Sequence, residues 1–217
     1  MNIPAVKIHF TDDDKKEILD KIKDSLSTGS LTLGKYGKEF EEKWANYIGS
    51  KYAISLNSGT ASIELPLRFF DIKGKDVLIP ANTFIATANA VVHAGGNPVL
   101  VDVKENLCMD PKNLKEKITK NTKGIVFVHI SGLVPKEILE VQKICKDNNF
   151  FLIEDAAHAH GSTLNGIKVG NFSDAASFSF YPTKIITSGE GGMINTNNEA
   201  MNNLARVIRD QGKSGFF

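Results

Sequence analysis

Two apolar runs, GIVFVHI at residues 124–130 and FFLIE at residues 150–154, decide how this chain folds. Each run is short and almost continuously apolar, which is typical of a strand covered on both faces. The residues near 135–148, between the two runs, show the apolar spacing of a helix. A strand, a helix and a second strand in this order predict a crossover between parallel strands.

The same alternation extends in both directions along the chain. Further strands are predicted at residues 52–56, 77–80, 98–103, 175–181 and 192–195. Further helices are predicted through residue 70, near 84–94, near 111–119 and near 198–210. The last two strands have no helix between them, so one antiparallel strand is expected. The sequence therefore predicts an α/β fold of three layers, α/β/α, with a mostly parallel mixed sheet.

The first 50 residues follow a different pattern. Thr11 and the three aspartates after it precede an apolar stripe at helical spacing, which predicts a helix capped by Thr11. The aspartates suit the positive end of that helix better than a metal site, and we expect no bound metal. A glycine-rich loop at 29–37 leads to a second predicted helix near 38–48. We predict a helical arm at 1–50 and one α/β domain at 51–217.

Composition narrows the class of protein. The 217 residues include 26 Lys+Arg and 25 Asp+Glu, and 41% of the residues are hydrophobic. Such a chain can bury a core, and its net charge of +1 gives no electrostatic reason to expect a nucleic-acid or membrane partner. Residues 1–6 lack a signal-peptide pattern, and Cys108 and Cys145 form no CxxC pair. We therefore expect a cytoplasmic protein with free thiols.

Polar and aromatic residues follow several predicted strands at the point where each strand ends. Examples are 58–60, 82–84, His129, Asp155 and His158. Because ligands of α/β sheets bind at the carboxyl ends of the strands, these residues predict a site, although surface exposure alone also favours polar residues there.

Three segments indicate the chemistry of that site. Ser58-Gly59-Thr60 opens a helix and suits a phosphate or an ordinary helix cap, while no GxGxxG or P-loop pattern follows a strand. Asp155 ends a buried strand, where it either caps the next segment or awaits a cationic partner. Lys184 follows the apolar run 177–181 and a proline turn, so it is either a desolvated nucleophile or a surface lysine. Pyridoxal phosphate explains all three together, since it needs an anion cradle, a partner for its ring nitrogen and an amine.

At this point the chain resembles the fold-type I, pyridoxal-phosphate-dependent sugar aminotransferases of the DegT/StrS type. The resemblance runs through almost the whole chain and is carried by five motifs in order. They are LNSGTAS at 56–62, IPANTFIAT at 79–87, IEDAAHA at 153–159, SFSFYPTK at 177–184 and GEGG at 189–192. It implies that residues 51–217 form the pyridoxal-phosphate-binding large domain of that fold.

The resemblance also implies roles for single residues. Lys184 would form the Schiff base and later move the reacting proton, and Asp155 would pair with the ring nitrogen. Phe84 would stack on the ring, and His158 would lie near the ring hydroxyl, although a structural role for this histidine stays open. The phosphate would be held by Gly59, Thr60 and Ser179. Three other histidines, His93, His129 and His160, are expected to be structural.

The reaction implied by the resemblance is transfer of an amino group, from glutamate as the usual donor, to a keto-sugar linked to a nucleotide. Family members form homodimers and carry a smaller C-terminal domain, which we expect to be absent here. Residues 131–136 and Ile185-Ile186 also depart from the commoner family pattern, which puts substrate binding in doubt. Two alternatives stay open: a non-catalytic homologue that binds the cofactor or a partner, and, on weaker grounds, a dinucleotide-dependent sugar-modifying enzyme.

Overall fold

The computed structural model describes residues 7–213. The predictions about residues 1–6 and about the chain end at Phe217 lie outside this range. The main sheet contains β1 (Tyr52–Leu56), β2 (Asp76–Pro80), β3 (Asn97–Val101), β4 (Thr122–Val128), β5 (Phe151–Asp155), β8 (Ala175–Ser179) and β9 (Gly192–Thr196). The helices are α1 (Asp12–Thr28), α2 (Lys35–Ile48), α3 (Gly59–Phe69), α4 (Ile85–His93), α5 (Pro111–Lys117), α6 (Glu137–Asn148) and α7 (Glu199–Arg209).

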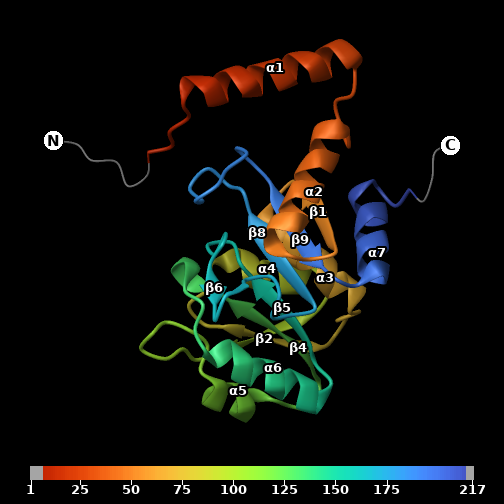
Figure 1. Ribbon diagram of the computed structural model, residues 1–217. Helices are drawn as coiled ribbons and strands as arrows, with labels where there is room; N and C mark the ends of the chain where they lie inside the picture. The colour runs from red at the N-terminus through yellow and green to blue at the C-terminus, as the bar shows by residue number, and fades with distance from the viewer. Residues whose placement is uncertain (1–6, 214–217) are drawn as a thin grey trace.

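The sheet has seven strands in the order β1-β9-β8-β5-β4-β2-β3 (Figure 1). β9 runs antiparallel to both of its neighbours, and the other neighbouring pairs are parallel. The predicted α/β fold with a mostly parallel mixed sheet and one antiparallel strand is therefore confirmed. Sequence patterns gave no sign of the small hairpin of β6 (Thr163–Leu164) and β7 (Ile167–Lys168), because two-residue strands have no measurable periodicity.

Helices cover both faces of the sheet, as the continuously apolar strands require. On one face, α3 and α4 pack on β2, β4 and β5, and α3 and α7 pack on β1, β8 and β9. On the other face, α5 and α6 pack around the fully buried Phe127, while α2 packs around Phe178. The alternation of side chains along each strand supplies both cores, although the edge strand β3 has exposed residues on it, with Leu100 at 54%.

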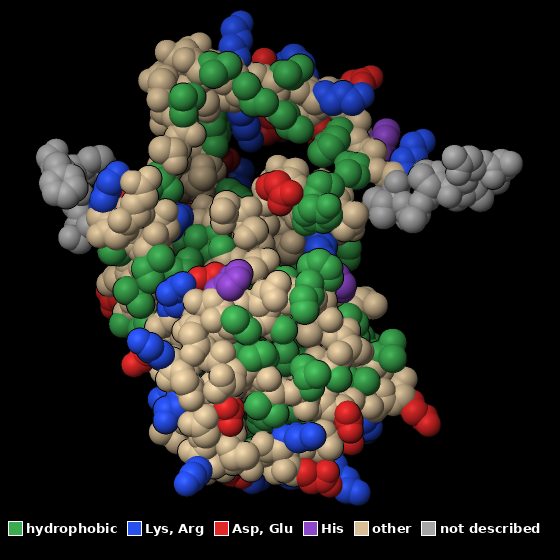
Figure 2. Space-filling model, turned by 180° about the vertical axis from the view of Figure 1, so that it is seen from behind, with side chains coloured by type: hydrophobic (Ala, Val, Ile, Leu, Met, Phe, Trp, Pro, Cys, Tyr) green, Lys and Arg blue, Asp and Glu red, His purple; other side chains and the backbone are tan. Residues whose placement is uncertain are grey.

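The two N-terminal helices differ in their contacts with the rest of the molecule. α1 begins with the predicted cap, in which Thr11 and Asp14 exchange hydrogen bonds, but it buries none of its side chains. Apolar side chains of α1 are exposed to solvent, and Figure 2 shows them along this helix. α2, by contrast, buries Trp44 and Ile48 in the core. Trp44 Nε1 also donates to Asn195 Oδ1 on β9, 2.8 Å away.

No helix within residues 7–213 is both long enough and apolar enough to cross a membrane.

Candidate functional site

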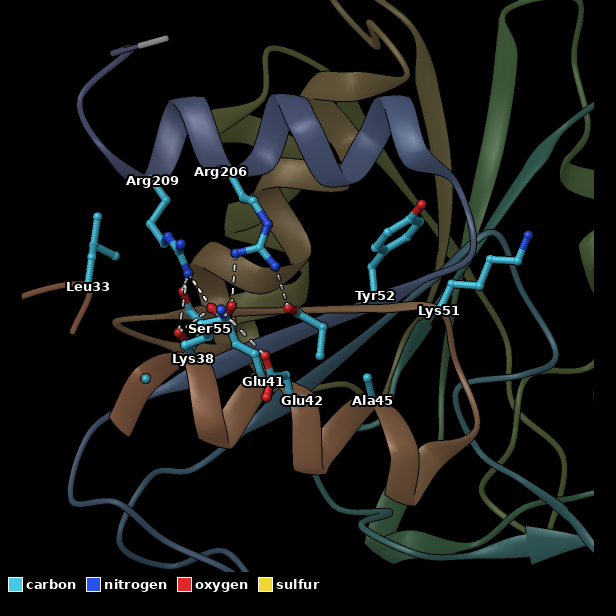
Figure 3. Close-up of a pocket in the computed structure, with 12 residues that line it drawn as sticks. Leu33, Lys38, Glu41, Glu42, Ala45, Lys51, Tyr52, Ser55, Arg206 and Arg209 are labelled. Carbon is cyan, nitrogen blue, oxygen red and sulfur yellow. Dashed lines mark hydrogen bonds and ion pairs between the residues drawn. The ribbon is translucent and has the colours of Figure 1, made fainter. Parts of the chain in front are cut away.

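Two of the hollows in the described part of the chain have a buried carboxylate in their wall, Glu41 in one and Asp155 in the other. The first, here called the charged hollow, lies where α2 and α7 meet over the edge strand β1. Figure 3 shows Arg206 and Arg209 reaching from α7 toward Glu41 on α2 and Ser55 on β1. Arg206 Nη1 lies 2.8 Å from Glu41 Oε2, and Arg209 pairs with the other oxygen of the same carboxylate.

These neighbours supply hydrogen bonds and positive charge to the carboxylate of Glu41. Burial raises the pKa of its carboxyl, but hydrogen bonds from Ser55 and Arg206 and the charge of Arg209 outweigh burial, so the pKa is lowered. Ser55 donates to Glu41 Oε1 from its backbone N–H at 2.9 Å and from its hydroxyl at 2.7 Å. Because two arginines pair with the carboxylate of Glu41, this network ties α2, β1 and α7 together, although Nε of Arg209 is buried without a hydrogen-bond partner in the described residues.

The second hollow, here called the strand-end cavity, is a cavity of about 510 Å³ at the carboxyl ends of the strands. The loops after β1, β2, β4, β5 and β8 all contribute to its wall. Every site residue that the sequence singled out lies in that wall, namely Gly59, Thr60, Phe84, Asp155, His158, Ser179 and Lys184. Gly59 and Lys184 are 125 positions apart in the sequence, and the sheet brings them to the same cavity.

One end of the strand-end cavity is the N-terminus of α3. Ser58 caps this helix by accepting the N–H of Ala61, and its first turn contains no acidic residue. Gly59 lies so close to β8 that an added Cβ would be 2.8 Å from Cβ of Ser179. The free N–H groups of a helix start and its positive dipole suit an anion, and here Ser179 stands beside them.

Asp155 lies at the floor of the strand-end cavity and is only 5% exposed. Its Oδ2 accepts from Thr87 Oγ1 at 2.8 Å, and its Oδ1 accepts from the backbone N–H of Ala157 at 3.2 Å. Neither Asp155 nor Lys184 takes part in an ion pair with a residue of the described range 7–213. A buried carboxylate without a cation suits a ligand that brings a positive charge or an N–H donor.

Lys184 faces the same cavity. Burial lowers the pKa of its amine below the ordinary value, and the charge of Asp155 opposes this only in part. A lowered pKa leaves more of the amine in its neutral, nucleophilic form at neutral pH. Phe84, at the start of α4, is 72% exposed and presents an apolar ring to the cavity.

The ring of His158 is held in one orientation. The backbone N–H of Ser131 donates to His158 Nδ1 at 3.2 Å, so the proton of the neutral ring resides on Nε2. Burial lowers the pKa of His158, and the charge of Lys184 lowers it further, which favours the neutral ring. Ser131 can approach His158 because the next residue, Gly132, has no side chain. The φ of Gly132 is +82°, and a Cβ there would lie 2.8 Å from the carbonyl oxygen of His158.

The other buried histidines have protein partners. His129 Nε2 lies 2.9 Å from Glu154 Oε2, and Glu154 also accepts from the backbone N–H groups of Gly170 and Phe172. His160 Nε2 lies 2.8 Å from the carbonyl oxygen of Ser179. These contacts agree with the structural role expected for His129 and His160, although His129 also borders the strand-end cavity.

Thr87 lines the cavity and was not selected as a site residue from the sequence. It lies inside one of the quoted motifs, but its role depends on contact with Asp155, which is 68 positions away. The available signal was a threonine on the buried face of an otherwise apolar helix, four residues after Thr83. Within residues 7–213, no group of three or more His, Cys, Asp or Glu side chains is arranged to hold a metal.

Known proteins are similar to this chain in both sequence and fold. The family model for the DegT/DnrJ/EryC1/StrS aminotransferase family matches residues 12–216. GDP-perosamine synthase of Caulobacter vibrioides is 40% identical over 188 residues, which cover 86% of this chain and 50% of that protein. Among solved structures, Helicobacter pylori PseC, an aminotransferase involved in the biosynthesis of pseudoaminic acid, has a TM-score of 0.89 and 32% identity, covering 96% of this chain and 56% of that one.

A further solved structure, ntda from Bacillus subtilis with bound cofactor PMP, has a TM-score of 0.85 and 33% identity, covering 91% of this chain and 45% of that one. The chain thus spans about half the length of the relatives that it matches.

Proposed function

This chain belongs to the DegT/DnrJ/EryC1/StrS aminotransferase family, and from that premise we propose that it is a pyridoxal-phosphate-dependent aminotransferase acting on sugar nucleotides. The amino group passes to a keto-sugar linked to a nucleotide, in the biosynthesis of amino sugars and polysaccharides. Glutamate is the proposed donor. The observation that carries the proposal is the strand-end cavity, where an amine with a lowered pKa and a buried carboxylate without a cation lie beside a helix N-terminus.

The residues of the strand-end cavity fit the cofactor pyridoxal 5′-phosphate. Gly59, Thr60 and Ser179 would hold its phosphate, because the helix start supplies N–H donors and Gly59 leaves no side chain in the way. Asp155 would accept from its ring nitrogen, and Phe84 would cover one face of its ring. Pyridoxal phosphate supplies an aldehyde that reacts with amines and a ring that withdraws electrons from them.

Lys184 and His158 would transfer a proton and orient the ligand, respectively. Lys184 would hold the cofactor covalently through Nζ and, once released, would accept and return the proton of the reacting carbon at the same atom. Its lowered pKa supports this role, because a neutral amine can accept a proton near neutral pH. His158 would donate from Nε2 to an oxygen of the ligand, since its Nδ1 already accepts from Ser131.

The assembly and location are proposed on separate grounds. Large apolar side chains beside the strand-end cavity are exposed, among them Ile85 at 62% and Ile185 at 75%, and we propose that a second copy of the chain covers them in a homodimer. Light scattering tests this, and a monomer at micromolar concentration would count against it. Cys108 and Cys145 are free thiols, which supports a cytoplasmic location.

Reduction with borohydride tests the proposed function most directly. The protein is incubated with pyridoxal phosphate, reduced, digested and mapped by mass spectrometry. We expect a phosphopyridoxyl group on Lys184, and a label elsewhere or no label would contradict the proposal. A second portion of the loaded protein, neither reduced nor digested, is given glutamate and a nucleotide-linked keto-sugar. A labelled Lys184 without formation of 2-oxoglutarate would favour the alternative, a homologue that binds the cofactor without turnover.

A further inference from the structure

Behind Asp155, two threonine hydroxyls form a short chain that the proposed function does not use. Thr87 is fully buried on the first turn of α4, and its Oγ1 lies 2.8 Å from Asp155 Oδ2. Thr83 precedes α4, and its Oγ1 lies 2.7 Å from Thr87 Oγ1. A threonine in a helix commonly returns its hydroxyl to a backbone carbonyl one turn earlier. Thr87 instead reaches across to the end of β5.

The carboxylate of Asp155 fixes which hydroxyl donates and which accepts in this pair of hydrogen bonds. An ionised carboxylate can only accept hydrogen bonds, so the single hydroxyl proton of Thr87 points to Asp155. Thr87 can then only accept from Thr83, and Thr83 must donate. With the N–H of Ala157 on the other oxygen, Asp155 receives a hydrogen bond on each of its two oxygens. Each oxygen of a carboxylate can accept more than one hydrogen bond, so Asp155 can still accept one from a ligand in the cavity.

We propose that Thr87, supported by Thr83, is a positioning residue that holds the carboxylate of Asp155 in place, so that the ring nitrogen of the bound cofactor keeps its proton. The inference rests on the proposed function. Its physical reason is that a carboxylate fixed by two hydrogen-bond donors can accept from the ring nitrogen without having to reorient. The pair of a carboxylate and a protonated ring nitrogen is therefore favoured over a neutral acid and an unprotonated ring, and only the protonated ring withdraws electrons strongly.

A valine and a serine at position 87 separate this role from packing. Thr87→Val keeps the shape and removes the hydroxyl, while Thr87→Ser keeps the hydroxyl and removes a methyl group. Each variant is loaded with pyridoxal phosphate labelled with ¹⁵N in the ring, and the ¹⁵N signal is followed across pH. We expect Thr87→Val to lose the ring proton about tenfold more readily than wild type, the effect of one hydrogen bond to a charged group. Thr87→Ser should behave like wild type.

Thr196→Val is the matched control. Thr196 is also buried, and its Oγ1 donates to the carbonyl oxygen of Asp174 at 2.7 Å, beside the first residue of β8 and so at the opposite end of the sheet from the cavity. This variant also loses a buried threonine hydroxyl, with its bonds to Asp174 and Asn198, and should cost stability without moving the ¹⁵N titration. Thr83→Val should move the titration in the same direction as Thr87→Val but by less, because Thr87 can still donate to Asp155.

The outcomes separate the inference from the function on which it rests. A wild-type protein that takes up no cofactor contradicts the proposed function. A wild-type protein with a protonated ring, together with a Thr87→Val titration equal to it, overturns the inference alone. Equal shifts in Thr87→Val and Thr87→Ser also overturn it, since they would indicate packing. If Thr87→Val does not fold, Thr83→Val decides, and an unchanged titration in that variant rejects the proposal.

Discussion

The charged hollow and the strand-end cavity use similar side chains for opposite purposes. In the charged hollow, the buried carboxylate of Glu41 pairs with two arginines and accepts a hydrogen bond from Ser55, so its charge is neutralised within the fold. In the strand-end cavity, Asp155 receives only a hydroxyl and a backbone N–H, and Lys184 has a lowered pKa rather than an ion pair. Charge alone therefore does not mark a functional site, and neither does a single unpartnered atom, since Nε of Arg209 in the charged hollow has no partner in the described residues. In the strand-end cavity, an amine and a carboxylate face one space and neither forms an ion pair within residues 7–213.

Replacing Lys184 should give the largest effect and should leave the fold unchanged. Lys184→Arg keeps a positive charge but removes the primary amine, so we expect transamination to fall by at least about a thousandfold. The borohydride label should disappear, and the melting temperature should stay near that of wild type.

Lys143→Arg provides the matched control, because Lys143 is exposed and pairs with Asp147 one turn along α6. It should change neither the label nor the activity. A Lys184→Arg protein that remains yellow with pyridoxal phosphate would remove the distinction between the two hollows.

Glu41→Gln should do the reverse, with a large loss of stability and unchanged cofactor binding. The variant leaves Arg209, only 16% exposed in its side chain, without its carboxylate. Breaking a buried pair from one side costs about 3 kcal/mol. Urea unfolding measures the loss, and titration with pyridoxal phosphate measures binding.

Glu42→Gln is the control for this change, since Glu42 borders the same hollow but its side chain is 64% exposed. Its free energy of unfolding should change by less than about 0.5 kcal/mol. A Glu41→Gln variant that is as stable as wild type would show that the network does not hold α2 and α7 together.

His160 lies between α2 and the residue Ser179 of the strand-end cavity, and it should make stability depend on pH. Its ring packs against Trp44 of α2, and its Nε2 meets the carbonyl oxygen of Ser179 at the cavity. Burial lowers the pKa of His160 from 6.5 to about 4, although the hydrogen bond to Ser179 opposes this. As the pH falls from about 6.5 to about 4, the unfolded chain binds a proton that the folded chain does not, so stability decreases.

His160→Gln isolates this effect, because glutamine can still donate to the carbonyl of Ser179 but does not titrate. Between pH 6.5 and 4.5, wild type should lose about 2 kcal/mol more stability than the variant. Chemical denaturation at several pH values measures the difference. Parallel curves for the two proteins would indicate that His160 does not titrate in this window.

The turn beside His158 should give the smallest effect. Gly132 and Gly166 both have a φ near +80°, but only Gly132 has backbone within reach of a Cβ. Both alanine variants therefore carry the same conformational cost, and Gly132→Ala should lose about 1 kcal/mol more because the carbonyl of His158 must shift. The same shift should weaken the bond from Ser131 to His158 Nδ1, which ¹⁵N spectra of the histidine rings can detect. Equal stabilities would show that the turn accommodates the change freely.

The periodicity of the sequence predicted most of the sheet, because strands buried on both faces must be apolar throughout. The runs at 124–130 and 150–154 correspond to β4 and β5, with boundaries shifted by one or two residues. The motifs also predicted seven of the residues that line the strand-end cavity, although their roles there remain predictions. The β6–β7 hairpin and the hydroxyl chain at Thr87 were not predicted. The first is too short for a pattern, and the second depends on a contact between distant residues.

The sequence by itself determined the succession of strands and helices, since that succession depends on the spacing of apolar side chains within short windows. It also determined which chemically active residues follow the strands. Only the tertiary structure decided which charges are neutralised and which are left without partners. Glu41 meets Arg209 across 168 positions and Asp155 meets Thr87 across 68. Such pairings form only when the folded sheet brings distant elements together, and neither spacing nor composition encodes them locally.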